Sequence, residues 1–171
     1  MLVGGTTPSV NETGDHGSLQ KSLSQTGTYT VGGDSFVLSS GNAAAVTLGT
    51  GTSHLAFIGP SSLRLTGGSG TATVTADTGT NTFTAGSGSL DVKGGGGKDT
   101  YVFHANSGRL IIEDFSAAKG DKLIIDSALK GSMVQASDYQ GGTLLTFGSG
   151  ANHAIDLHGL AAVPATLINW M

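Results

Sequence analysis

The chain has 171 residues, of which 29 are glycine and only 12% are charged. So much glycine without a three-residue period excludes collagen and leaves either a disordered linker or a β architecture dense in turns. The net charge of −4 argues against nucleic acid as a partner, and the absence of cysteine excludes disulfides and thiolate chemistry.

Residues 1–30 carry the weakest signal, and we assign them to an N-terminal segment or cap. Within them, GSLQKSLSQ (17–25) would suit one or two turns of amphipathic helix. The N-terminus lacks the basic segment and apolar run of a secretory signal peptide. No apolar run in the chain approaches the ~20 residues needed to cross a membrane, so we expect a protein that does not span one.

Residues 31–102 divide into eight blocks of nine, and the last four read GGSGTATVT, ADTGTNTFT, AGSGSLDVK and GGGGKDTYV. The sixth and eighth places of a block are two residues apart, so in a strand they face the same way. Most residues at these places are apolar, whereas the seventh and ninth are mostly Thr, Ser, Lys or Arg. The inward set predicted in this way is Phe36, Leu38, Ala45, Thr47, His54, Ala56, Leu63, Leu65, Ala72, Val74, Asn81, Phe83, Leu90, Val92, Asp99 and Tyr101.

This pattern predicts an all-β fold, a parallel β-roll or β-solenoid of nonapeptide repeats over 31–107. Each block would form one turn and one short strand, and two blocks would complete a coil that stacks on the next by parallel pairing. Glycine suits the turns because the backbone there must adopt positive φ and pack closely against the next turn. Apolar residues at most sixth places predict that the N-terminal coils fold without metal.

Residues 108–171 are predicted to form a C-terminal antiparallel β cap that covers the last coil. Short apolar strands alternate with a polar turn in 109–126, and 127–139 suits a short helix or an irregular loop. Strands at 143–147 and 153–158, joined by Gly148-Ser149-Gly150, are typical of a β-hairpin.

The block Gly94–Val102, GGGGKDTYV, fits the nonapeptide G-G-x-G-x-D-x-U-x at every specified place. It resembles the repeats-in-toxin (RTX) calcium-binding β-roll. The following run DTYVF…LIIEDF…KGDKLIIDSAL…GGTLLTF…HAIDLHGL resembles the C-terminal segment that closes such rolls in bacterial proteins exported by type I secretion.

The resemblance implies that turn aspartates and turn carbonyls of stacked coils hold Ca²⁺, a hard cation that takes six or more oxygen ligands. Carried onto this sequence, Asp99 is the strongest ligand candidate. Asn81 and Asp77 would lie on one neighbouring turn and Asp114 on the other, with Glu113 and Asp121 as weaker candidates. The alternative is that Asp99 and Asp114 only accept hydrogen bonds from turn amides, as aspartate commonly does.

Other chemistry-bearing residues give weaker patterns. His153, Asp156 and His158 are close in sequence, but in a strand 153 and 158 point to opposite faces, so we do not predict a transition-metal site from them. His54, at a sixth place, is expected to be a hydrogen-bonded core histidine. No G-x-S-x-G elbow is present, and the glycine runs lack the G-K-[ST] of a phosphate loop, so we expect no enzymatic activity.

The sequence therefore predicts an extracellular, secreted, non-catalytic β-roll that acts as a calcium-assisted folding and type I secretion module. By resemblance, the segment AAVPATLINWM at the C-terminus would carry the signal for the type I secretion machinery. The alternative is a matrix protein or surface adhesin that self-associates or binds polysaccharide or a cell surface through its Thr and Ser rows. A β-helical polysaccharide-modifying enzyme, the third reading, lacks any catalytic constellation.

Overall fold

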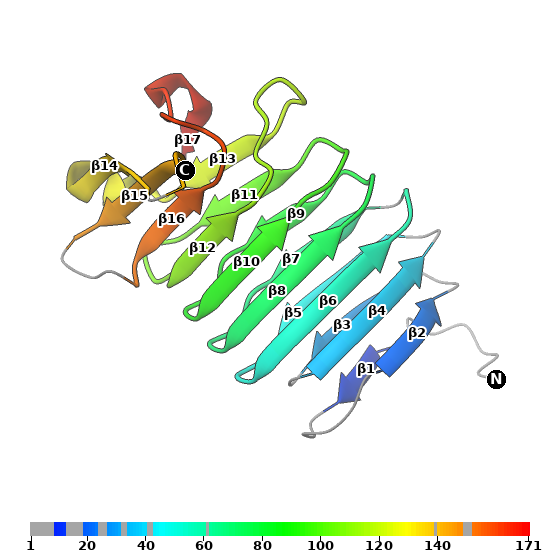
Figure 1. The fold of residues 1–171 in the computed structure, drawn as a ribbon. Helices are drawn as coiled ribbons and strands as arrows, with labels where there is room; N and C mark the ends of the chain where they lie inside the picture. The colour runs from blue at the N-terminus through cyan, green and yellow to red at the C-terminus, as the bar shows by residue number, and fades with distance from the viewer. Residues whose placement is uncertain are drawn as a thin grey trace.

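The computed structural model describes residues 9–12, 19–23, 27–31, 34–40, 43–60, 62–138, 140–148 and 152–171, with side chains from residue 43 onward. Its strands form two sheets that face each other across a narrow core, and up to β14 the chain passes from one sheet to the other at each turn (Figure 1). The predicted all-β solenoid is confirmed. Apart from two short 3-10 helices, Ser127–Ser132 and Ala165–Leu167, the regular structure of the described residues is β.

The first sheet is parallel throughout and contains the odd-numbered strands from β1 to β13, followed by β17. In sheet order, these strands are β1 (Ser9–Glu12), β3 (Gly27–Val31), β5 (Ala44–Leu48), β7 (Leu63–Thr66), β9 (Thr82–Thr84), β11 (Thr100–Phe103), β13 (Lys122–Ile125) and β17 (Ile168–Trp170).

The second sheet is parallel from β2 to β16 and ends in antiparallel pairs. From that end, its strands are β14 (Met133–Ser137), β15 (Thr143–Phe147), β16 (Ala154–Leu157), β12 (Arg109–Ile112), β10 (Ser89–Lys93), β8 (Thr71–Ala76), β6 (Thr52–Ile58), β4 (Asp34–Ser40) and β2 (Leu19–Leu23).

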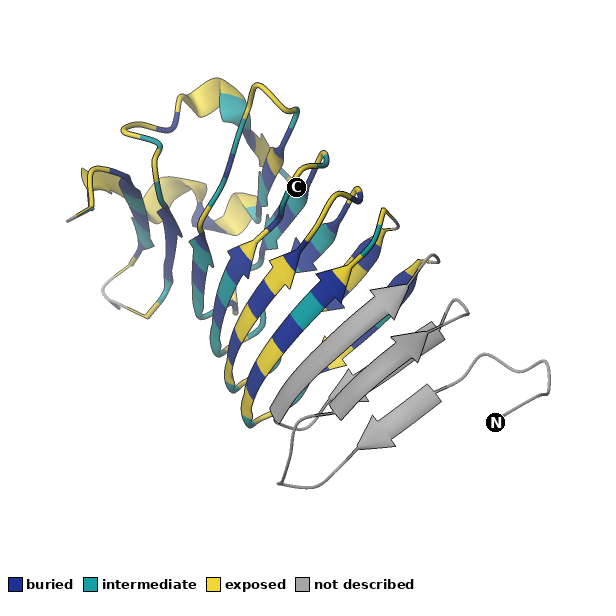
Figure 2. Cartoon of the chain, turned by 45° about the vertical axis from the view of Figure 1, so that its right-hand side comes forward, coloured by how far each residue is buried: buried dark blue, intermediate teal, exposed yellow. Residues whose placement is uncertain are grey.

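Period-two alternation places one face of each strand in the core, and Figure 2 shows buried and exposed residues alternating along the strands. In β8, for example, Ala72, Val74 and Ala76 are buried while the threonines between them are exposed. The core also holds an aromatic stack, in which the rings of Phe83 and Tyr101 lie 5.5 Å apart. The hydrophobic effect along this continuous apolar column holds the coils together.

The predicted inward positions are confirmed from Leu63 to Tyr101, but they are wrong by one residue between 44 and 57. Ala44, Val46 and Leu48 are buried on β5, whereas Thr47 is exposed and Ala45 only partly buried. On β6 the inward residues are Ser53, Leu55 and Phe57, so the expected core residue His54 is exposed and Ala56 only half-buried. Phe36 and Leu38 lie outside the described side chains.

One added residue between β6 and β7 explains the slip. Leu55 and Leu65 occupy equivalent inward positions ten residues apart, whereas Leu65, Val74 and Phe83 follow at intervals of nine. Gly59 in this connection adopts φ 134°, which a side chain would disfavour. A shift of one residue in a strand exchanges its faces, so a strict count of nines fails upstream of this point.

The N-terminal and C-terminal segments also differ from expectation. The stretch 17–25 contains strand β2 rather than a helical turn, and β1, β2 and β3 pair as later coils do. Parallel pairing also continues past 107 through β12, β13, β16 and β17, so the cap extends the roll rather than interrupting it. The expected β15–β16 hairpin is confirmed, and β14 adds an unpredicted third strand.

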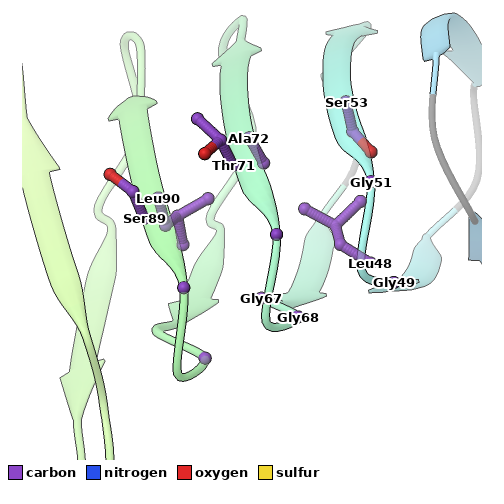
Figure 3. Close-up of a pocket in the computed structure, with 13 residues that line it drawn as sticks. Leu48, Gly49, Gly51, Ser53, Gly67, Gly68, Thr71, Ala72, Ser89 and Leu90 are labelled. Carbon is purple, nitrogen blue, oxygen red and sulfur yellow. The ribbon is translucent and has the colours of Figure 1, made fainter.

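Glycines line one corner of the roll, where β7 leads into β8 and β9 into β10 (Figure 3). A Cβ on Gly88 would overlap the carbonyl oxygen of Gly70 in the preceding coil, and one on Gly70 would overlap that of Gly51. Backbone bonds run along this corner, such as those from Ser89 N to Gly70 O (3.0 Å) and from Thr71 N to Gly51 O (3.1 Å). Glycine is therefore required here because backbone packs directly on backbone.

Among the described residues, we find no helix of the length and apolar character needed to cross a membrane.

Candidate functional site

Most of the predicted ligands lie at the opposite corner of the roll, where the second sheet leads into the first. We call the turns 77–81, 94–99 and 113–121 the acidic corner. The turn 94–99 stacks on the turn before it through a bond from Gly96 N to Asp77 O (2.6 Å). Gly95 has φ 90°, and a Cβ there would overlap Asp77 O, which accounts for the glycine run in this block.

A ladder of Asn and Asp side chains runs through the acidic corner, and we call Asn81, Asp99 and Asp121 the Asx ladder. Each occupies the same place in its coil, directly before an odd-numbered strand. Asn81 Oδ1 accepts from Leu63 N, Asp99 Oδ1 from Asn81 N and Asp121 Oδ1 from Asp99 N, each at 2.9 Å. Each side chain therefore binds the backbone of the preceding coil.

The members of the Asx ladder are nearly fully buried, with exposed fractions of 0% for Asn81, 1% for Asp99 and 7% for Asp121. Asn81 uses its amide nitrogen as well, donating to Gly79 O (3.3 Å) and Gly94 O (3.2 Å). Asp121 Oδ2 accepts from Ser116 N at 2.8 Å. Buried polar groups of this kind are tolerated because they are hydrogen-bonded, and these bonds set the register between coils.

Asp114, in the last turn of the acidic corner, also accepts hydrogen bonds from backbone amides of the preceding turn. Its two carboxylate oxygens accept from Gly94 N (2.8 Å) and Gly95 N (2.9 Å). These are the bonds expected if Asp99 and Asp114 hold turn amides. The stacking of 94–99 between the neighbouring turns, inferred from sequence, is therefore confirmed.

Burial raises the pKa of Asp99 from 3.8 to about 6, an effect to which the nearby carboxylates of Asp121 and Asp114 add while hydrogen bonds from Asn81 oppose it. The hydroxyl of Tyr101 lies in the same region, buried without a hydrogen-bond partner. Burial and the same three carboxylates raise the Tyr101 pKa well above its ordinary value. The acidic corner therefore brings three carboxylates together around a buried tyrosine hydroxyl, two of them nearly fully buried.

The remaining predicted ligands lie apart from this cluster. The Asp77 side chain is exposed, and the turn uses its backbone carbonyl instead. Glu113 is exposed and contacts His158, with 3.0 Å between Oε2 and Nδ1. Lys119, which the sequence did not single out, donates from Nζ to Gly95 O at 3.0 Å. The structure thus brings together Asn81, Asp99, Asp114 and Asp121 and places Asp77 and Glu113 at the margin.

The donor atoms of the acidic corner have the chemistry that Ca²⁺ prefers, since carboxylate and carbonyl oxygens are its usual ligands. Both oxygens of Asp114 and of Asp121 accept from backbone amides, however, and Lys119 engages a turn carbonyl. A cation would have to displace some of these donors. Calcium binding at the corner therefore stays a prediction, and the bonds that the structure shows there join neighbouring coils through protein groups.

A second feature is a shallow groove on the outer side of the roll, beside the glycine corner. We call it the hydroxyl groove. Its volume is about 410 Å³, and the strand registers place Thr52, Thr71, Ser89 and Arg109 in one row across it. Thr50, Ser69, Ser87 and Asn152 complete its polar lining. Its hydroxyls suit a polar ligand, while no aromatic ring among its lining residues offers a stacking surface.

His153 and His158 belong to different surroundings. The ring of His153 stacks on Phe103 at 5.3 Å and lies 5.6 Å from Phe147, at the junction of roll and cap. His158 contacts Glu113 on the outer side. Sequence reasoning missed Asp138, which lies beside His158, because Asp138 belongs to the irregular connection between β14 and β15 that carries no repeat.

No family model, curated protein or solved structure matches this chain.

Proposed function

We propose that this chain is a non-catalytic, extracellular RTX-like β-roll that serves as a folding and type I secretion module. Calcium would assist folding at the acidic corner. The observation that carries the proposal is that, among the described side chains, the buried and partly buried carboxylates in the turns of the roll lie in the coils next to the cap. Asp99, Asp114 and Asp121 lie there, whereas the equivalent place one coil before Asn81 holds the apolar Leu63.

The electrostatics of the acidic corner support a role for a cation in stabilising the fold, and the earlier coils do not require one. Burial and, to a smaller extent, two nearby carboxylates raise the pKa of Asp99, and a divalent ion would stabilise its ionised form against both effects. The coils before it have an apolar core and backbone bonds that need no ion. We therefore expect Ca²⁺ to stabilise the last coils and the cap, with little effect on the earlier coils.

The structure of the C-terminal segment supports export before folding. Residues 168–170 form β17, which pairs with β13, and Met171 exchanges backbone bonds with Ile125 (3.1 Å) and Ser127 (3.0 Å). Once folded, this segment belongs to the sheet and is no longer an accessible extended signal. In our proposal, the secretion machinery reads the segment on the unfolded chain, and the cap folds outside the cell.

Far-UV circular dichroism in excess EGTA, followed by Ca²⁺ titration, tests the role of calcium. We expect a β spectrum already in EGTA and a higher melting temperature of the last coils with Ca²⁺. Amide exchange should locate the added protection at 94–126. The variant Asp99→Asn should lose the Ca²⁺ response, while Asp77→Asn, whose side chain is exposed, should keep most of it. A melting temperature that Ca²⁺ does not change would remove calcium from the proposal.

Export is tested separately, by expressing the chain with a type I secretion system. Deletion of 160–171 should abolish its appearance in the medium. A double substitution of Ile58 and Val134, both exposed, to serine provides a control that should leave export intact. Export that persists without 160–171 would exclude the secretion role.

The hydroxyl groove favours a second candidate function, an adhesin that binds polysaccharide. Ordered hydroxyls and one guanidinium across stacked coils are suited to hydrogen bonding along a glycan chain. Retention on polysaccharide columns would test it, with Thr71→Val expected to weaken retention. Thr73→Val changes an exposed threonine on the same strand outside the groove and should not. Self-association, the related possibility, would appear as concentration-dependent size in light scattering.

A further inference from the structure

Three potential ligands meet at the cap, outside the acidic corner. They are Asp138 in the connection from β14 to β15, Asp156 in β16 and His158 just after β16, and we call them the cap cluster. Each offers one ligand atom, and these atoms all lie within 4.8 Å of one another. Among the described residues, no other group of three or more His, Asp or Glu side chains lies this close together.

Asp156 lies on a strand covered on both faces, and only 3% of its surface is exposed. Its Oδ2 contacts Nη2 of Arg109 at 2.6 Å, which fixes the carboxylate plane. Its other oxygen, Oδ1, is buried without a hydrogen-bond partner and lies 3.9 Å from His158 Nε2. A buried carboxylate oxygen without a donor is costly, so this atom is the strongest sign that a cation belongs here.

In Asp138, too, one carboxylate oxygen is hydrogen-bonded and the other is not. Oδ1 accepts from Gly142 N at 2.5 Å and from Gln140 N at 2.8 Å, so the turn into β15 holds the side chain in place. Oδ2 is buried without a hydrogen-bond partner. One buried and one partly buried carboxylate thus each have an oxygen without a hydrogen-bond partner, and each offers an oxygen within 4.8 Å of a ring nitrogen of His158.

His158 is oriented by Glu113, whose Oε2 lies 3.0 Å from Nδ1. A carboxylate at this distance favours a proton on Nδ1, and in that tautomer the Nε2 lone pair, 3.9 Å from Asp156 Oδ1, is open to a metal ion. Metal-binding histidines usually donate their other ring N–H to a carboxylate in this way. All three members of the cap cluster therefore have one atom held by a neighbour, and each offers a ligand atom to a group that spans no more than 4.8 Å.

From this arrangement we propose that the cap cluster binds a divalent transition-metal ion, Zn²⁺ in the first instance. Imidazole nitrogen and carboxylate oxygen are both Zn²⁺ ligand types, and three such ligands leave a fourth position for water. An imidazole ligand favours Zn²⁺ over Ca²⁺, which prefers oxygen. The site is thus distinct in both place and chemistry from the acidic corner.

Binding requires the three ligand atoms, which lie within 4.8 Å of one another, to move closer together. Zn²⁺ bonds of about 2.0–2.1 Å in a tetrahedron separate neighbouring ligand atoms by roughly 3.3 Å. The 3.9 Å between Asp156 Oδ1 and His158 Nε2 is close to that separation. The ion would join the β14–β15 connection to β16 and, through Glu113, to the end of β12. It would therefore fasten the antiparallel strands of the cap to the last coils of the roll.

The test uses the untagged protein, stripped with EDTA, dialysed and titrated with ZnCl₂ by calorimetry and thermal melting. We expect one Zn²⁺ per chain and a melting temperature raised by roughly 5–10 °C at a hundred times the dissociation constant. Asp138→Asn keeps the acceptor for Gly142 and Gln140 but removes the charge, and should weaken binding at least tenfold. His158→Gln should do the same. Co²⁺ bound to the wild type should give the visible absorption of a four- or five-coordinate ion.

The matched controls are His54→Gln and Asp77→Asn, which change an exposed histidine and an exposed carboxylate elsewhere on the roll. Both should bind Zn²⁺ as the wild type does. Circular dichroism checks that each variant is folded. If His158→Gln does not fold, the Zn²⁺ affinity of Asp138→Asn alone tests the proposal. The proposal would be overturned if Zn²⁺ did not raise the melting temperature of the wild type. It would also be overturned if Asp138→Asn bound Zn²⁺ as tightly as Asp77→Asn. A CaCl₂ titration that reproduces the effect would assign the site to calcium and overturn it equally.

Discussion

The carboxylate of Asp99 accepts a hydrogen bond from the backbone amide of Asn81 at 2.9 Å, across the interface between two coils. Asn81 repeats the relationship with Leu63, and Asp121 repeats it with Asp99. One side-chain position thus carries a chain of bonds parallel to the roll axis. A place that the resemblance assigns to metal ligation is used here, in the bonds that the structure shows, to tie backbone to backbone.

Replacing Asp99 should change how stability depends on pH. Its pKa is about 6 in the folded chain and near 3.8 when unfolded, so between these values the folded state holds a proton that the unfolded state has lost. Stability should therefore fall as pH rises from about 4 to about 6, by up to about 3 kcal/mol. Asp99→Asn keeps an acceptor for the Asn81 amide and should remove this loss. Urea unfolding in EGTA at pH 4 to 8 measures it, and an unchanged pH slope in the variant would contradict the assignment.

Asn81→Ala should be among the more destabilising polar substitutions in the roll. It leaves the amide of Leu63 and the carbonyls of Gly79 and Gly94 without their side-chain partner in a buried place. An unsatisfied buried group costs about 1–3 kcal/mol, and the two carbonyl contacts are longer and weaker than the bond to the Leu63 amide, so we expect a total loss of roughly 2–4 kcal/mol. Asp77→Ala removes an exposed side chain from the same turn and should cost less than about 0.5 kcal/mol in EGTA. Similar losses for the two variants would show that the Asx ladder contributes little.

Gly88→Ala tests the glycine corner. A Cβ at this position meets the backbone carbonyl of Gly70, which no rotamer change can relieve, so neighbouring coils would have to separate. We expect a loss of about 3 kcal/mol or more, as for overpacking in a rigid interior. Gly131→Ala is the control, because a Cβ there meets nothing within 4 Å. Thermal melting of both variants gives the comparison, and a Gly88→Ala protein as stable as the control would refute the backbone-on-backbone packing.

Phe103→Ala should destabilise roll and cap together. Its ring lies 5.2 Å from that of Phe147 and 5.3 Å from that of His153, and its exposed fraction is 0%. Removing a buried phenylalanine costs about 3–5 kcal/mol. If the cap continues the roll, one unfolding transition should move to a lower temperature. A second transition that appears while the first stays in place would show two independent units. Ile58→Ala, half exposed, should change stability by less than about 0.5 kcal/mol.

The strong part of the sequence prediction came from the repeat itself. From Leu63 to Tyr101, the residues at the sixth and eighth places of each block were correctly predicted to face the core. The stacking of the turn 94–99 between its neighbours was also predicted correctly. The prediction failed between 44 and 57 because a single added residue between β6 and β7 reverses strand faces without altering composition. His54 was misplaced for that reason.

The candidate sites were predictable to different degrees. Asp99 and Asp114 could be named because they fall in turns that the repeat defines. Asp121 was ranked low because the coil after residue 102 is longer, so that Thr100 pairs with Lys122, 22 residues on, while Thr82 and Thr100 are 18 apart. Only the three-dimensional structure shows that Asp121, and not a residue 18 positions later, continues the Asx ladder.

The sequence by itself determined the solenoid, because a period of nine with inward apolar places leaves a stacked parallel coil as the way to bury those side chains. Tertiary structure decided the rest: which strand faces turn inward after an insertion, which turn amides each carboxylate binds, and how the cap is fastened. Asp138 and Asp156 come from segments without a repeat, and they meet because β14, β15 and β16 pair side by side. Local pattern fixes the period of a repeat protein, whereas contacts between non-repeating segments depend on the folded path of the chain.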